Sequence, residues 1–154
     1  MECRDGIGAN ERLLWHGTGS KAKPADIYDG ECGFDFRMAN GGHYGRGTYF
    51  AEVAVYSNSG YAYASTVQVP GKGTSVACKQ LFLARVLVGD AKDFESRGSS
   101  ALKRPPTKDG STAMYDSVCG NLGYTLPAPR SGPAKMFVTY DRSQAYPQYL
   151  VSYT

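Results

Sequence analysis

A histidine that leads directly into a glycine turn is the first place where this sequence could do chemistry. Residues 13–15 are apolar and end at His16, and Gly17 opens the turn that follows. The pattern predicts a buried strand with the histidine at its end. A neutral imidazole there can hydrogen-bond a ribose hydroxyl, while Gly17 can offer its backbone N–H and C=O to a ligand amide. The same pair also fits a packed core histidine, so alone it decides nothing.

Aromatic residues and glycines are unusually frequent, with twelve tyrosines and nineteen glycines in 154 residues. Tight turns beside aromatic faces predict a cleft for a flat, polar ligand. Tyr49 lies in a strand candidate at 47–50, and Ser57 and Tyr61 follow it closely. Tyrosines at strand ends are also common in cores, which is the alternative for Tyr44, Tyr56 and Tyr63. The alternative for Ser57 is a hydroxyl that bonds its own helix end.

The glycine-rich stretches do not match the common nucleotide-binding turns. Glycines 42, 45 and 47 have the wrong order for a dinucleotide fingerprint, and the GKG at 71–73 lacks the Ser or Thr of a P-loop. The four cysteines contain no C-x-x-C pair, so we expect free thiols and no metal site. Any nucleotide must therefore be held in another way.

Composition predicts one soluble domain with a real core. Hydrophobic residues make up 42% of the chain, and the net charge of +3 is too small to indicate a dedicated nucleic-acid protein. The longest apolar run, at 81–88, is interrupted by Arg85 and is too short to cross a membrane. No secretory signal is present at the N-terminus, so we expect an intracellular protein of the cytoplasm or nucleus, without membrane contact.

The elements that must position these residues are mainly strands. Apolar and β-branched runs predict strands at 13–15, 47–50, 80–88, 136–140 and 149–153, with helices near 24–28 and within 51–57. The last two strands, joined by residues 141–147, are expected to be antiparallel neighbours. Without a regular β-α-β alternation, the prediction is an α+β fold with many strands and few short helices.

Several ordered blocks carry a resemblance over nearly the whole chain. They are residues 10–18 with LWHGT, 33–37, 43–51 with HYGRGTYFA, 85–89, 115–118 and 137–150. Together they resemble the NAD-binding catalytic domain of poly(ADP-ribose) polymerase-like, or diphtheria-toxin-like, ADP-ribosyltransferases. The resemblance implies an α+β core of split antiparallel β-sheets with few short helices. Relative to that family, residues 1–154 are expected to be a single catalytic domain that lacks the usual first strand and helix.

The resemblance implies roles for individual residues around NAD as co-substrate. Tyr49 and Tyr61 would sandwich the nicotinamide ring, with Tyr63 as a competitor for the place of Tyr61. Gly17 and Ser57 would bind the carboxamide. His16 would hold the adenosine-side ribose, beside the cofactor-binding residue Thr18. Arg37 would meet the adenosine or the diphosphate, since its forked donors suit phosphate; the alternative is a solvated surface charge.

The third catalytic position departs from the chain-elongating pattern. Where those relatives carry a glutamate, this chain has Met136, so the combination is His16-Tyr49-Met136. A carboxylate there stabilises charge on the sugar and activates a ribose hydroxyl as acceptor, and a thioether can do neither. The resemblance therefore implies the mono-ADP-ribosylating branch.

We expect a monomeric NAD-dependent mono-ADP-ribosyltransferase that acts on a protein side chain, on itself or on a nucleic-acid end. An inactive module of the same fold that binds NAD, ADP-ribose or a protein is the alternative, because the glutamate is missing. A third candidate is an RNA 2′-phosphotransferase, which shares a His-Gly-Thr turn but uses basic residues for phosphate.

Overall fold

A network of eight strands organises the chain, and the computed structural model describes residues 8–35, 37, 39, 41–121 and 125–154. The strands are β1 (Glu11–His16), β2 (Thr48–Ala51), β3 (Tyr63–Gln68), β4 (Ser75–Leu87), β5 (Ala91–Asp93), β6 (Ser117–Gly120), β7 (Met136–Thr139) and β8 (Ala145–Tyr153). Helices α1 (Pro24–Tyr28) and α2 (Ala54–Asn58) have five residues each, and a 3-10 turn, η2 (Arg142–Gln144), precedes β8.

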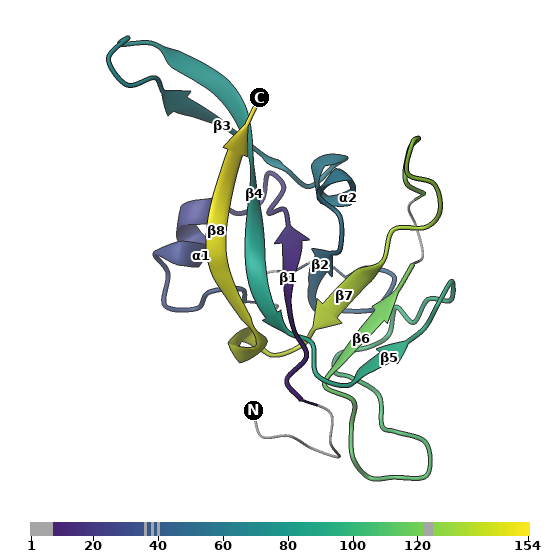
Figure 1. Cartoon of the computed structure of the whole chain (residues 1–154). Coiled ribbons are helices and arrows are strands. Elements are labelled where there is room, and N and C mark those ends of the chain that lie inside the picture. The colour runs from purple at the N-terminus through teal and green to yellow at the C-terminus, as the bar shows by residue number, and fades with distance from the viewer. Residues whose placement is uncertain (1–7, 36, 38, 40, 122–124) are drawn as a thin grey trace.

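The sheet is nearly divided in two (Figure 1). Its order is β3-β4-β1-β2-β7-β6-β5, and β8 also pairs with β4. The described pairings are antiparallel apart from the parallel pair β5–β6. Strands β1 and β2 share the register pair Trp15–Ala51, whereas β1 and β4 share six pairs. The α+β class predicted from the sequence is confirmed, with the two halves connected at β1–β2.

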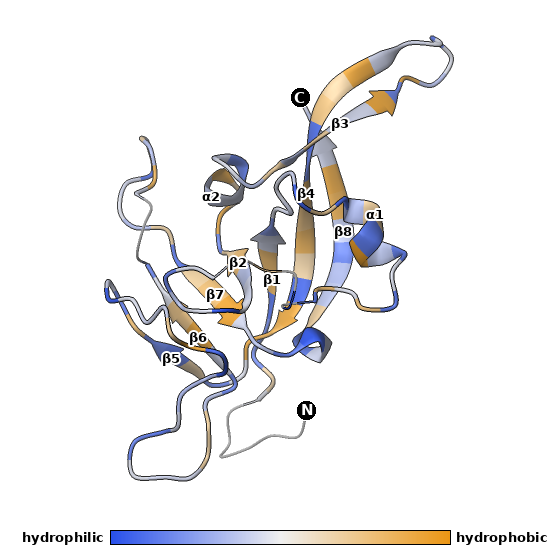
Figure 2. Cartoon of the chain, turned by 180° about the vertical axis from the view of Figure 1, so that it is seen from behind, coloured by the Kyte–Doolittle hydropathy of each residue, from blue (hydrophilic) through white to orange (hydrophobic). Residues whose placement is uncertain are grey.

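Two apolar clusters hold the halves together. Along β4, Phe82, Ala84 and Val86 alternate into the core and pack with Leu14 and Phe50. The second cluster lies around β6 and β7 and contains Tyr44, Val118, Met136, Val138 and Tyr140. Hydrophobic colour is concentrated along β4, β6 and β7 in Figure 2. The clusters fix the strand ends from which His16 and Tyr49 project.

Strands β7 and β8 are not neighbours, so the expected antiparallel pair is wrong. β7 pairs with β2 and β6, whereas β8 pairs with β4. Asp141 accepts a hydrogen bond from the Ser143 backbone N–H at 2.8 Å and starts the η2 turn. The Gln144 side chain then donates to the carbonyls of Leu87 and Asp116 at 3.2 and 3.0 Å. This buried amide directs the chain across to the other half of the sheet.

The cysteines are free thiols wherever the structure describes them. Cys32 is exposed, Cys78 is half-buried and Cys119 is buried. Cys3 lies outside the described residues. Burial raises the pKa of the Cys119 thiol to about 11, which keeps it protonated and makes it part of the packing.

Candidate active site

A cavity of about 1090 Å³ opens where the two halves of the sheet meet. Its walls come from the ends of β1, β2 and β7, from the loop after β1 and from α2. It brings together most of the residues that the sequence singled out: His16, Gly17, Thr18, Tyr49, Ser57, Tyr61 and Met136. Residues 120 positions apart in the chain therefore face one space.

His16 presents a defined tautomer to this cavity. Its Nδ1 lies 2.7 Å from the backbone oxygen of Tyr49. A carbonyl only accepts, so Nδ1 carries the hydrogen and Nε2 keeps a lone pair. The rings of Phe34 and Phe50 stand 5.0 and 5.3 Å from the imidazole. Burial lowers the pKa of His16, against the weaker opposing effect of the Tyr49 carbonyl, so the ring is neutral at pH 7 and Nε2 can accept a hydroxyl hydrogen.

The Tyr49 hydroxyl is fixed by two hydrogen bonds. It donates to the Gly45 carbonyl at 2.8 Å and accepts from the Tyr44 backbone N–H at 3.0 Å. Burial raises the pKa of Tyr49, so the phenol stays protonated and can keep both bonds. The ring is thus a rigid wall of the cavity, and the 42–45 turn is anchored to it.

The backbone of Gly17 makes a contact that no larger residue permits. Any Cβ at this position would overlap the Tyr61 carbonyl. The same carbonyl accepts the Gly19 N–H at 2.7 Å. The glycine turn is therefore held directly against the segment that carries Tyr61, with its backbone at the cavity wall. Thr18 lies between these glycines and its hydroxyl contacts the Gly19 carbonyl at 3.4 Å.

Ser57 lies on α2 with its side chain buried. Its hydroxyl is 3.4 Å from the Trp15 carbonyl, 42 positions away, so the bond to its own helix end that we kept as an alternative is not the one formed. A hydroxyl also accepts, and a carboxamide N–H could be its donor. The Trp15 contact ties α2 to the end of β1.

Two tyrosine rings stack at the mouth of the cavity. Tyr61 is 50% exposed, and its ring lies 5.6 Å from that of Tyr56 at an interplanar angle of 24°. Tyr56 also lines the cavity, with its hydroxyl 3.8 Å from the sulfur of Met136. Tyr63 belongs to β3, opposite Gln80, and is absent from the described lining. A core position was the alternative for Tyr56 in the sequence, and the structure has its ring both packed against the second apolar cluster and lining the cavity.

Met136 gives the cavity an apolar floor. Its side chain is 1% exposed at the start of β7, where it pairs with Ala51 of β2. The acidic residues of the described lining are Asp26 and Asp35. Asp35 is neutralised by Arg37, which holds the pKa of that carboxyl at about 2. Met136 itself thus brings no charge to the cavity.

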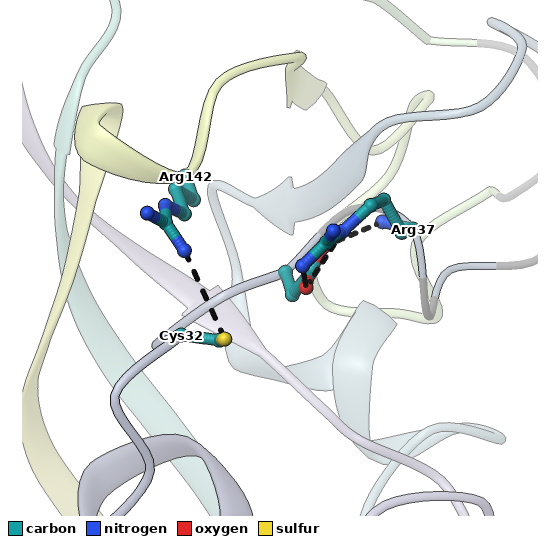
Figure 3. A network of polar contacts seen from close by, with 4 residues as sticks. Cys32, Arg37 and Arg142 are labelled. Atoms are coloured by element: carbon teal, nitrogen blue, oxygen red, sulfur yellow. Dashed lines mark hydrogen bonds and ion pairs between the residues drawn. The ribbon is translucent and has the colours of Figure 1, made fainter.

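Arg37 does not line the described cavity itself, but it is paired with Asp35, which does. Its guanidinium forms a fork on the Asp35 carboxylate, with Nε 2.9 and 3.0 Å from the two oxygens. The side chain is 67% exposed, and Asp35 rather than Arg37 lines the described cavity. Figure 3 shows this pair beside the separate contact of Arg142 with the Cys32 sulfur at 3.8 Å. To hold a phosphate, Arg37 would have to give up its hydrogen bonds to the Asp35 carboxylate and form bonds to the ligand instead.

A divided sheet with a histidine, two tyrosines and a glycine turn around one cavity defines a catalytic domain of the ADP-ribosyltransferase type. The chain belongs to the poly(ADP-ribose) polymerase catalytic domain family, whose pattern matches residues 2–154. This family uses NAD as a substrate. The resemblance seen in the sequence is confirmed.

The curated relatives support the mono-ADP-ribosylating branch. Protein mono-ADP-ribosyltransferase PARP12 of Mus musculus is 37% identical over 154 residues, which are 97% of this chain and 18% of that protein. For PARP11 of Homo sapiens the identity is 36% over 157 residues, with coverage of 94% and 41%. Human PARP14 is 32% identical over 158 residues, with coverage of 99% and 7%. The chain thus spans less than half the length of each of these relatives.

Two further observations bound the site. In the described part of the chain, no group of three or more His, Cys, Asp or Glu residues is placed to hold a metal ion. The described helices are also too short and too polar for any of them to cross a bilayer.

Proposed function

We propose that this chain is an NAD-dependent mono-ADP-ribosyltransferase. It releases nicotinamide and moves one ADP-ribose to an acceptor, most simply a protein side chain. The observation that carries the proposal is that His16, Tyr49 and Met136 share one cavity. The resemblance assigns Met136 to the position where chain-elongating relatives hold a glutamate. In this proposal, residues 1–154 act as one catalytic unit.

The cavity fits NAD in size and in chemistry. Its volume of about 1090 Å³ lies just above the usual range for small-molecule sites, about 300–1000 Å³, which leaves room for a dinucleotide. The acceptor nitrogen of His16 suits a ribose hydroxyl, and the Gly17 backbone with the Ser57 hydroxyl suits a carboxamide. Tyr49 and Tyr61 supply aromatic faces for the pyridine ring. Thr18 and Arg37 are assigned to the adenosine and diphosphate side.

These residues orient the ligand, exclude water and leave the bond cleavage to a dissociative path. The C1′–N bond breaks with its electron pair going to nicotinamide, and an acceptor oxygen forms the new bond to C1′. Tyr49 and His16 stay neutral and move no proton in this step. A neutral leaving group needs no metal. Positioning of this kind supplies a large share of the barrier reduction in many enzymes.

Met136 limits the reaction to a single transfer. A thioether cannot take the proton of a ribose hydroxyl, so an ADP-ribose already attached is not activated as the next acceptor. An acidic acceptor supplies its own carboxylate and needs no base. The proposed acceptors are therefore protein carboxylates, including those of this chain, and the proposed enzyme acts as a monomer inside the cell.

The missing glutamate also favours a second candidate, a module that binds NAD or ADP-ribose without catalysis. Calorimetry with a non-hydrolysable NAD analogue, followed by incubation with labelled NAD, separates the two. If the chain is an enzyme, we expect binding of the analogue, release of nicotinamide and acceptors that carry single ADP-ribose units. Binding without release would select the module, and the absence of both at millimolar NAD would remove both candidates.

A further inference from the structure

Tyr56 forms the wall above Met136 in the same cavity as His16. Its hydroxyl is 3.8 Å from the Met136 sulfur, and its ring stacks on Tyr61. It reaches this place because α2 follows β2 directly, so Tyr56 and Ser57 come from one helical turn. The phenol oxygen therefore stands next to the side chain that replaces the carboxylate.

The chemistry of that hydroxyl differs from that of a carboxylate. A phenol donates one hydrogen bond and also accepts, and a thioether is a weak acceptor for its O–H. Burial, and then the nearby Tyr61 phenol, raise the pKa of Tyr56 far above neutrality. The group is thus a permanent neutral hydrogen-bonding partner that cannot serve as a base near pH 7.

We propose that Tyr56 binds the 2′-hydroxyl of the nicotinamide-side ribose of NAD. The proposal rests on the function proposed above, because it places nicotinamide between Tyr49 and Tyr61. In the proposed pose, the ribose attached to that ring runs along the wall formed by Tyr61, Tyr56 and Met136, which line the same cavity and contact one another in this order. Along this described stretch of wall, the phenols of Tyr61 and Tyr56 can both donate to and accept from a sugar hydroxyl, and the Tyr56 hydroxyl is the one that contacts Met136.

This contact explains how a site without the glutamate can still orient its sugar. The phenol holds the ribose in place, but it does not take a proton from it. Binding and elongation, which one carboxylate combines in polymerases, are thereby separated. Tyr56 is a substrate-binding residue in this account, and Met136 is its apolar neighbour.

The test is a comparison of two ligands with two proteins. The ligands are benzamide adenine dinucleotide, which cannot be cleaved, and its counterpart without the 2′-hydroxyl on the benzamide-side ribose. We expect the wild-type chain to prefer the hydroxylated ligand by about three- to tenfold in calorimetry, the size of one neutral hydrogen bond. Tyr56→Phe keeps the ring and should bind both ligands equally.

Two variants control for indirect effects. Tyr63→Phe removes a phenol hydroxyl from β3, away from the described lining, and should keep the wild-type preference. Tyr56→Leu is a second protein without the hydroxyl, and it should also lose the preference. Thermal unfolding of each variant shows that binding is measured on folded protein.

The outcomes distinguish this inference from the function on which it rests. If the wild-type chain binds both dinucleotides and Tyr56→Phe keeps the full preference, the role of Tyr56 is overturned while the NAD site stands. A wild-type chain without any preference overturns it equally. If the wild-type chain binds neither ligand, the proposed function falls together with the inference.

Discussion

The phenol of Tyr61 is the most exposed part of the proposed nicotinamide site. Its ring can stack on a flat ligand because the carbonyl of the same residue is already fixed by Gly19. We predict that Tyr61→Ala weakens binding of a nicotinamide mimic such as benzamide by about 1–3 kcal/mol, measured by calorimetry. Tyr63→Ala, outside the described lining, should leave the affinity unchanged. The reverse pattern would transfer the stacking role to Tyr63.

Met136 is the residue that separates single transfer from elongation in this account. Met136→Glu places a carboxylate in a site that is 1% exposed, so we expect a loss of about 2–4 kcal/mol in unfolding free energy. The same carboxylate should increase nicotinamide release into water, measured as NAD hydrolysis without acceptor. Met136→Gln is the matched uncharged control. Equal hydrolysis by the two variants would contradict the role assigned to this position.

The sequence identified the residues of the candidate site better than it identified the hydrogen-bond partners of those residues. The resemblance pointed to His16, Tyr49, Ser57, Tyr61 and Met136, and the structure brings them to one cavity. The Tyr49 carbonyl that fixes the His16 tautomer, and the hydroxyl bond of Ser57 to Trp15, depend on contacts 33 and 42 positions apart. Such contacts leave no local pattern. The ion pair of Arg37 is the opposite case, because its partner Asp35 is only two residues away in the sequence and could have been found there.

The turn before β2 decides where Tyr49 stands. The N–H and C=O of Gly42 and Gly45 bond each other, and the Gly45 carbonyl accepts the Tyr49 hydroxyl. Gly45 has a φ of +77°, and a methyl group there would overlap the Leu102 carbonyl. A short strand therefore carries a precisely anchored side chain only because the turn beside it is built from glycine.

Two glycine substitutions separate backbone strain from this clash. Gly71 in the β3–β4 hairpin has nearly the same φ, +76°, but open space around it. We predict that Gly71→Ala costs about 1 kcal/mol of unfolding free energy and Gly45→Ala about 2–4 kcal/mol, measured by urea denaturation. Gly45→Ala should also weaken NAD binding. Equal losses for both variants would show that the 42–45 turn relaxes freely.

The strands with a strong apolar pattern were predictable, and the weakly patterned ones were not. Residues 80–88 predicted most of β4, because Phe82, Ala84 and Val86 alternate into the core. Strand β3 is largely exposed and mixes Ser, Thr and Gln, so its composition resembles a loop. The four buried residues of β6, at 117–120, are too few for a periodic signal. Both strands form because β4 and β7 offer them edges.

At the scale of the whole molecule, the cavity lies beside the β1–β2 pairing, which is the shortest strand pairing described in the sheet. One register pair links β1 to β2, and the walls of the cavity come from both sides of that link. The resemblance implied split antiparallel sheets, whereas the described strands form one mixed sheet that is joined at this link and includes the parallel pair β5–β6. The connection through β1–β2 and the crossing of β8 to β4 could not be predicted, since both depend on tertiary hydrogen bonds.

The free energy of unfolding should depend on pH through the imidazole of His16, which lies where the two halves of the sheet meet. The pKa of His16 is lowered in the folded state, so below pH 6.5 the unfolded chain binds more protons and unfolding becomes easier. Stability is therefore complete above pH 6.5 and is lost as the pH falls toward the folded pKa. His16→Asn, whose amide can replace the Nδ1–H bond, should show a smaller fall between pH 7 and 5 in urea denaturation. Parallel profiles would contradict a neutral His16.

The most direct test of the central claim is a crystal structure of this chain with a benzamide-type nicotinamide mimic. We predict the ring between Tyr49 and Tyr61, with its carboxamide on the Gly17 backbone and the Ser57 hydroxyl. A mimic bound outside this cavity, or a ring without contact to either phenol, would contradict the proposed NAD site.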